Sequence, residues 1–169
     1  KKHMLTISEK VEFLNGVSAF NELLPEQFQS LANICEEKFY NAGERIFSQG
    51  EADGALFIVV SGKVLLERET DDANKSVSMN TVGTRGYFGE ISLFYDAPWS
   101  VSATAMQSTK VLKLINDDFA VFVTGQPRLL VKMNTVLSQR LVEAHDKISE
   151  ITRNRKPREL QKLYDGLNF

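Results

Sequence analysis

The pattern of hydrophobic and polar positions divides the chain into a helical start, a strand-rich middle and a helical end. In residues 5–35, hydrophobic side chains recur every three or four positions, which predicts short helices. Pro25 stands at the first position of one of these patterns, where a proline is favoured because its missing N–H is not needed. We expect this region to be structural, since core packing explains its apolar positions.

Residues 38–115 consist of short hydrophobic runs that are separated by turns, many of which contain glycine. Residues 56–60 and 64–67 flank a tight turn, and we interpret them as the two strands of a hairpin. Residues 69–75 are polar and are expected to form an exposed loop. Many short strands closed by turns predict a small antiparallel roll or barrel. The other expected strands are residues 39–40, 45–47, 76–82, 101–106 and 111–115.

Helical periodicity returns after residue 115. Residues 116–124 begin with Asn-Asp-Asp, and acidic residues favour a helix N-terminus. After Pro127 a long helix is expected to run to about residue 153.

The long helix carries a seam of positions that step alternately by four and three residues, as in a coiled coil. We expect the seam to pack against a second copy of the helix, giving a homodimer through residues 127–153. The alternative is that it packs back on the roll. The seam positions are Leu130, Asn134, Leu137, Leu141, Ala144, Ile148 and Ile151.

Composition narrows the functional class. With 169 residues, 43% hydrophobic residues and a net charge of −2, the chain is expected to be one ordinary globular domain with a helical appendage. The near-neutral charge argues against a nucleic-acid surface, and no apolar run approaches the roughly 20 residues of a membrane span. A single cysteine, Cys35, cannot form an intrachain disulfide, so we expect a buried thiol and a cytoplasmic location.

The sequence contains no set of residues that predicts an enzyme or a metal site. His3 and His145 are its two histidines, and no Ser-His-Asp set, metal-ligand cluster or phosphate-binding Walker motif can be assembled. Residues 1–4 are typical of a cloning-site remnant, which suggests a piece of a longer protein. We divide the rest into a roll with flanking helices (5–126), the long helix (127–153) and a linker or the start of another segment (154–169).

Candidate chemistry is concentrated in residues 86–103, with the sequence GYFGEISLFYDAPWSVSA. Gly89 allows the backbone to approach a ligand closely, because it has no Cβ. Glu90 is an acceptor where the chain enters a predicted helical turn over 91–95, whose free N–H groups favour an anion. Ser100 and Ser102 follow where the next expected strand opens. A carboxylate beside such N–H groups suits a ribose phosphate.

The order Phe-Gly-Glu-Ile-Ser-Leu from Phe88, then Pro98 and a strand of small residues, resembles the phosphate-binding cassette of cyclic nucleotide-binding domains. The spacing is most similar to that of regulatory subunits of cAMP-dependent protein kinase. The resemblance covers roughly residues 9–153 and implies an α+β fold. That fold is a small, jelly-roll-like antiparallel β-roll with N-terminal helices and a long C-terminal helix. In this family an arginine after the proline pairs with the cyclic phosphate, whereas this chain has Trp99.

The resemblance also implies the ligand-binding residues. In the related catabolite activator class, two hydroxyl residues contact the base, and their positions correspond to Ala144 and His145 in this chain. Ala144 lacks a polar side chain. His145 either contacts a purine edge or is simply solvated. Arg85 either replaces part of the missing charge or is an exposed turn residue. The implied site is Phe88, Gly89, Glu90, Ile91, Ser92, Trp99, Ser100, Val101, Ser102 and His145.

Three ligand states follow from Trp99, because an indole cannot neutralise a phosphate. The site binds cAMP or a related purine nucleotide weakly, it holds another nucleotide or a nucleoside, or the indole fills it and nothing binds. We interpret the chain as a regulatory, ligand-sensing domain with cAMP or another purine nucleotide or nucleoside as effector, and the long helix as its signal output. The alternative is a ligand-free dimerisation module of the same fold. In neither case does this fragment contact nucleic acid or a membrane.

Overall fold

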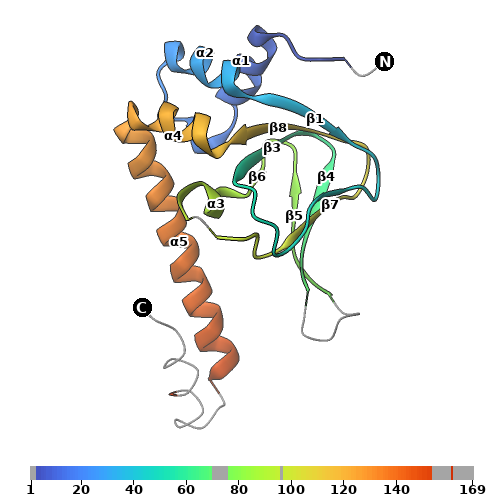
Figure 1. Cartoon of the computed structure of the whole chain (residues 1–169). Coiled ribbons are helices and arrows are strands. Elements are labelled where there is room, and N and C mark those ends of the chain that lie inside the picture. Colours follow the sequence, from blue (N-terminus) through green and yellow to red (C-terminus); the bar gives the residue numbers. More distant parts are fainter. Residues whose placement is uncertain (1–2, 70–75, 96, 154–160, 162–169) are drawn as a thin grey trace. The chain divides into compact units, whose positions relative to one another are not determined.

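The computed structural model describes residues 3–69, 76–95, 97–153 and 161 (Figure 1). Contacts divide the chain into two units, Lys1–Leu129 and Leu130–Phe169, which are described separately.

The first unit opens with three short helices, α1 (Ile7–Asn15), the 3-10 helix η1 (Ser18–Phe20) and α2 (Pro25–Ile34). Thr6 begins α1 with a capping box. The Glu9 N–H donates to the Thr6 hydroxyl, and the Thr6 N–H donates to the Glu9 carboxylate. The predicted helices and the place of Pro25 at the start of α2 are confirmed.

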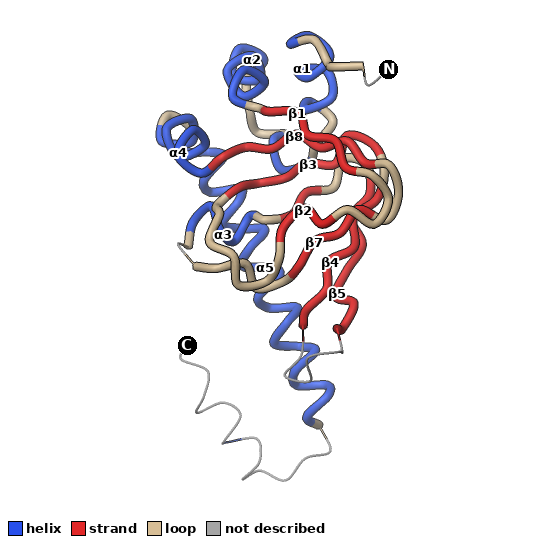
Figure 2. Tube along the Cα trace, turned by 45° about the vertical axis from the view of Figure 1, so that its right-hand side comes forward, coloured by secondary structure: helices blue, strands red, loops and turns tan. Residues whose placement is uncertain are grey.

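Within the described residues, eight strands form two four-stranded antiparallel sheets that pack on each other as an open roll (Figure 2). The first sheet has the order β1 (Glu36–Tyr40), β8 (Thr109–Ile115), β3 (Ala55–Ser61) and β6 (Tyr87–Phe88). The second has the order β2 (Arg45–Phe47), β7 (Ser102–Ala105), β4 (Lys63–Glu69) and β5 (Ser76–Gly83). A cluster of buried residues from both sheets fills the roll, as the sequence predicts for this fold class.

The predicted hairpin of β3 and β4 is wrong. β3 pairs with β6 and β8, whereas β4 pairs with β5 and β7, so the chain crosses from one sheet to the other at Gly62. Gly62 has a φ of 98°, and a Cβ there would lie 2.7 Å from the Ser108 carbonyl oxygen. A tight turn brings two strand ends together, but it does not decide which strands share hydrogen bonds.

The expected strand over residues 76–82 is present as β5, but most of its residues are exposed and it has no buried face. Val77 and Met79 are both exposed, and the pairing with β4 shifts register between Leu66 and Glu67. The predicted loop over 69–75 falls, after Glu69, outside the described residues.

Two further helices have the predicted positions. α4 (Asn116–Thr124) buries Phe119 and Val123, and α5 (Pro127–Thr152) is the long helix. In the single chain the seam residue Leu141 is 51% exposed, whereas Leu137 and Ile148 are half-buried, and dimerisation stays a prediction. No helix within the described ranges is long and apolar enough to cross a membrane.

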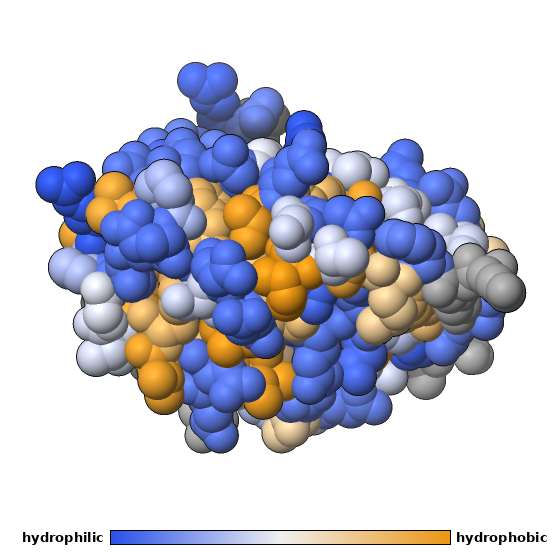
Figure 3. Space-filling view, turned by 90° about the horizontal axis from the view of Figure 1, so that it is seen from above, coloured by the Kyte–Doolittle hydropathy of each residue, from blue (hydrophilic) through white to orange (hydrophobic). Residues whose placement is uncertain are grey.

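The face seen from above in Figure 3 is mostly hydrophilic, with small hydrophobic patches between polar side chains. Cys35 is buried at the end of α2, as expected, and burial raises the pKa of its thiol to about 12, which keeps it protonated and unreactive at neutral pH.

Candidate functional site

Gly89 joins β6 to the short helix α3 (Glu90–Phe94), which begins one residue earlier than the predicted turn. Its φ of 89° lies in the left-handed region that favours glycine. A Cβ here would collide with the Ala55 carbonyl oxygen of β3 and lie 3.2 Å from the ring of Trp99. Glycine is therefore required both for the backbone conformation and for the close approach of α3 to β3.

Replacing Gly89 by alanine should destabilise the domain by more than the strain of the left-handed backbone alone, which costs about 1–3 kcal/mol. Gly43→Ala is a matched control, because Gly43 has a φ of 81° and open space around its Cβ position. Thermal or urea unfolding of both variants measures the difference. Equal losses of stability would contradict the close approach at Gly89.

Two hydrogen bonds of Ser92 fix the position of α3. The Ser92 hydroxyl donates to the Gly89 carbonyl at 2.8 Å, and the Asn116 side-chain amide donates to the Ser92 carbonyl at 2.6 Å. Glu90 is 8% exposed and Ser92 is buried, whereas Ile91 is 57% exposed. The carboxylate therefore lies on the inner side of α3 and the isoleucine on its outer side. The sequence interpretation missed Asn116, where Asn-Asp-Asp was read as a helix start and nothing more.

Trp99 is 6% exposed and belongs to the cluster that fills the roll. Its ring stacks on Phe47 at a centroid distance of 4.0 Å and an interplanar angle of 14°. Phe57 and Phe88, which are paired across β3 and β6, stack on each other at 5.2 Å. We call Phe47, Phe57, Phe88 and Trp99 the aromatic cluster; of these four, the sequence analysis named only Phe88 and Trp99 as site residues.

The backbone of Trp99 is also fixed. Its N–H donates to the Glu51 carbonyl at 2.9 Å, and its own carbonyl accepts from the Gly50 N–H at 2.8 Å. The indole Nε1 is buried, and within the described structure it has no hydrogen-bond partner. The residue at the family's arginine position thus lies inside the roll against Gly89, with one unused donor.

The segment after Trp99, which leads into β7 at Ser102, contains three of the predicted residues. Ser100 is exposed, Val101 packs against the buried cluster, and Ser102 is buried. The Ser102 hydroxyl donates to the Glu69 carboxylate at 3.1 Å and accepts from the Gln49 N–H at 2.9 Å. Both bonding directions of this hydroxyl are therefore used within the protein.

Two further predicted residues come from outside residues 86–103. The Arg85 guanidinium lies beside Gly16 at the end of α1: a Cβ added to Gly16 would be 2.9 Å from the Cζ atom of Arg85. Of the two predicted roles of Arg85, the turn residue therefore fits better than the replacement charge. His145 lies on α5 in the second unit. Its contact with a ligand stays a prediction, as do the ligand contacts of the other site residues.

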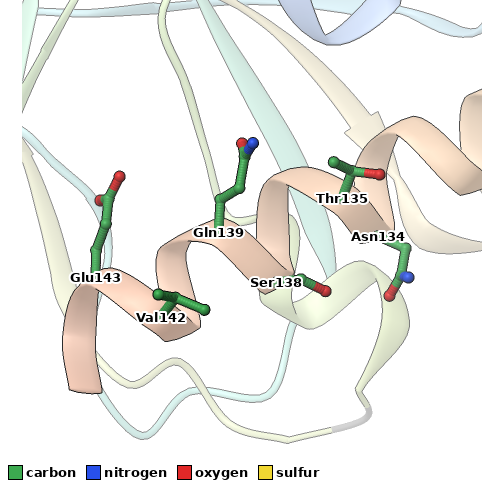
Figure 4. Close-up of a pocket in the computed structure, with 6 residues that line it drawn as sticks. All are labelled: Asn134, Thr135, Ser138, Gln139, Val142 and Glu143. Carbon is green, nitrogen blue, oxygen red and sulfur yellow. The ribbon is translucent and has the colours of Figure 1, made fainter. Parts of the chain in front are cut away.

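The second unit has a pocket of its own, with a volume of about 650 Å³. Figure 4 shows that its six labelled residues all project from α5, and none of them belongs to the cassette. They are Asn134, Thr135, Ser138, Gln139, Val142 and Glu143. In the part of the chain that the structure describes, no group of three or more His, Cys, Asp or Glu side chains is arranged to hold a metal ion.

Chemically, the cassette combines a buried carboxylate, four aromatic rings and one unused neutral donor. The sequence has no lysine or arginine between Arg85 and Lys110. These groups suit a ligand with hydroxyl groups better than one with a buried negative charge.

Similarity to known proteins agrees with the fold. The chain is 32% identical over 154 residues to the cyclic AMP receptor protein of Thermus thermophilus, covering 89% of this chain and 71% of the relative. The crystal structure of the Thermus thermophilus catabolite activator protein superposes with a TM-score of 0.74 at 29% identity, covering 79% of this chain and 62% of that one.

A more distant structure shares the fold alone. It is the regulatory subunit of a cAMP-independent protein kinase A from Trypanosoma cruzi bound to guanosine, with a TM-score of 0.65 and 17% identity, covering 79% of this chain and 50% of that chain. Residues 37–125 match the family described as the cyclic nucleotide-binding domain. With this match and the first relative, the predicted resemblance is confirmed: the chain belongs to the cyclic nucleotide-binding domain family.

Proposed function

We propose that this chain is a regulatory domain that senses cAMP or a related purine nucleotide, which it binds weakly at the cassette. The observation that carries the proposal is the pair of Gly89 and Glu90, where a left-handed glycine begins α3 and places a carboxylate that is 8% exposed. A carboxylate is an acceptor that a ribose hydroxyl can satisfy. The membership of the family supports the same ligand class.

Weak binding follows from Trp99. A charge-assisted hydrogen bond to a phosphate contributes roughly 1.5–3 kcal/mol, which corresponds to about ten- to a hundredfold in affinity. Trp99 offers no positive charge, and the Arg85 guanidinium lies beside Gly16. The cyclic phosphate would therefore lose this contribution without a replacement at the same position.

A second candidate function rests on the same residue. Because the indole is 6% exposed and stacks on Phe47, it fills space inside the roll, which favours a ligand-free dimerisation module. The guanosine bound by the Trypanosoma cruzi kinase subunit supports a third state, a nucleoside ligand in this fold. Calorimetry with cAMP, cGMP, cyclic di-GMP and adenosine separates the candidates. If none of the four compounds gives a heat of binding, the ligand-free dimerisation module is the candidate that remains.

The output of the domain is proposed to be α5. Ligand binding would move α3 toward the bound ligand and reposition α5 of a homodimer. The repositioned α5 would pass the signal to an output domain. The chain spans 71% of the Thermus thermophilus receptor, so the output domain and its partners remain proposals. We further propose a cytoplasmic, non-catalytic role without nucleic-acid contact by this fragment, in keeping with the receptor and kinase regulatory subunits among its relatives.

Replacing Glu90 by glutamine should weaken binding of cAMP about fivefold, since a charge-assisted hydrogen bond becomes a neutral one and the difference is roughly 1 kcal/mol. Glu12→Gln on the exposed side of α1 removes the same charge away from the cassette and is the control. Calorimetric titration measures both. An affinity for cAMP that is unchanged in Glu90→Gln would argue against ribose binding by this carboxylate.

A further inference from the structure

We propose that this site selects an uncharged purine nucleoside over the corresponding cyclic phosphate, and that the indole N–H of Trp99 is the specificity-determining group. The inference rests on the proposed function, because it names the ligand class of the same site. The three observations that carry it are the charges around the cassette, the unused donor of Trp99 and the aromatic cluster.

The charges disfavour an anion. A buried charge is unfavourable unless it is paired, and the sequence has no cation between Arg85 and Lys110. The Arg85 guanidinium lies against Gly16. Lys113 is 5.8 Å from the centre of the Phe57 ring, but its ammonium is already paired with the Asp53 carboxylate at 3.2 Å. Residues 86–109 therefore supply no cation of their own to a phosphate at Trp99.

The indole N–H needs an acceptor. Trp99 is more than nine-tenths buried, and its Nε1 has no partner in the part of the chain that the structure describes. An indole N–H is a donor only, and buried donors without partners are rare in proteins. A neutral acceptor atom on a nucleoside would satisfy it without bringing a charge into the roll.

The aromatic cluster surrounds the indole with buried apolar rings, so a hydrogen bond to its N–H would be shielded from water. Phe47 and Trp99 stack at 4.0 Å, and Phe57 and Phe88 stack at 5.2 Å, so flat rings already pack face to face here. A nucleoside also keeps its ribose hydroxyls, which are the groups that suit the Glu90 carboxylate. Loss of the phosphate therefore removes only the part of the ligand for which the site has no counterpart.

The test is calorimetric titration of the whole chain with matched pairs, adenosine against cAMP and guanosine against cGMP. We expect at least one nucleoside to bind about tenfold or more tightly than its cyclic phosphate. Trp99→Phe keeps an aromatic ring and removes the N–H. This substitution should weaken the binding of the nucleoside by roughly two- to tenfold, which is the contribution of one neutral hydrogen bond. It should leave the affinity for the cyclic phosphate nearly unchanged.

A second measurement does not depend on any variant. The chain has one tryptophan, so its indole N–H gives a single resonance in a proton–nitrogen spectrum, and this resonance should shift downfield when the nucleoside binds. Tighter binding of the cyclic phosphate would overturn the inference and leave the proposed function standing. An indole resonance that does not move, with a nucleoside bound, would overturn the role of Trp99. No binding of any of the four compounds would overturn both proposals.

Discussion

Replacing Trp99 by arginine should raise the affinity for cAMP by roughly ten- to a hundredfold. The guanidinium would supply the charge-assisted bond that the indole cannot form, to a site that already contains Gly89 and the Glu90 carboxylate. The preference between adenosine and cAMP should reverse in the same variant. Calorimetry with both ligands measures the two effects.

Trp99→Ala is the control for this substitution, because it removes the indole without adding a charge. It should change the affinity for cAMP much less than arginine does, but it should lower the free energy of unfolding by about 3–5 kcal/mol, the usual loss for a buried aromatic ring. If the indole fills the ligand site, the Trp99→Ala variant should bind nucleotide, whereas the unmodified chain should not. If neither variant binds any nucleotide, the sensor proposal fails and the dimerisation module remains.

Truncating the seam of α5 should have the second large effect. Leu137→Ala and Leu141→Ala should each weaken the proposed dimer by about 2–5 kcal/mol, since each removes a leucine that a partner helix would bury. Val131 lies off the seam and is exposed, so Val131→Ala should leave the dimer intact. Light scattering over a range of protein concentrations measures the dissociation. A parent chain that is folded but monomeric at high micromolar concentration would contradict the dimer.

The helices were the part of the fold that could be predicted most closely. α4 begins at Asn116 and ends at Thr124, as predicted, because an acidic start and a following Gly125 mark its ends in the sequence. Pro127 marks the start of α5 in the same way. These signals are local, so a reading along the chain finds them.

The pairing of strands and the direction of side chains were harder to predict. The crossover at Gly62 reads in the sequence as an ordinary hairpin, since both have a tight turn between hydrophobic runs. The cassette was recognised from its spacing, but the place of Trp99 depends on Phe47, which is far away in sequence. The same holds for Arg85, whose neighbour Gly16 belongs to a different element.

The pairing of β1 with β8 has a consequence for how this domain folds. Glu36 lies opposite Lys113, and β8 also pairs with β3, so the first sheet cannot close until nearly the whole roll has been synthesised. Contacts between such distant segments slow folding, because the loop between them loses entropy before the contact forms. α1 and α2 leave the ribosome long before their sheet exists. We therefore expect an early intermediate with formed helices and unpaired strand edges, and a roll that depends on β8 for its final, rate-limiting step.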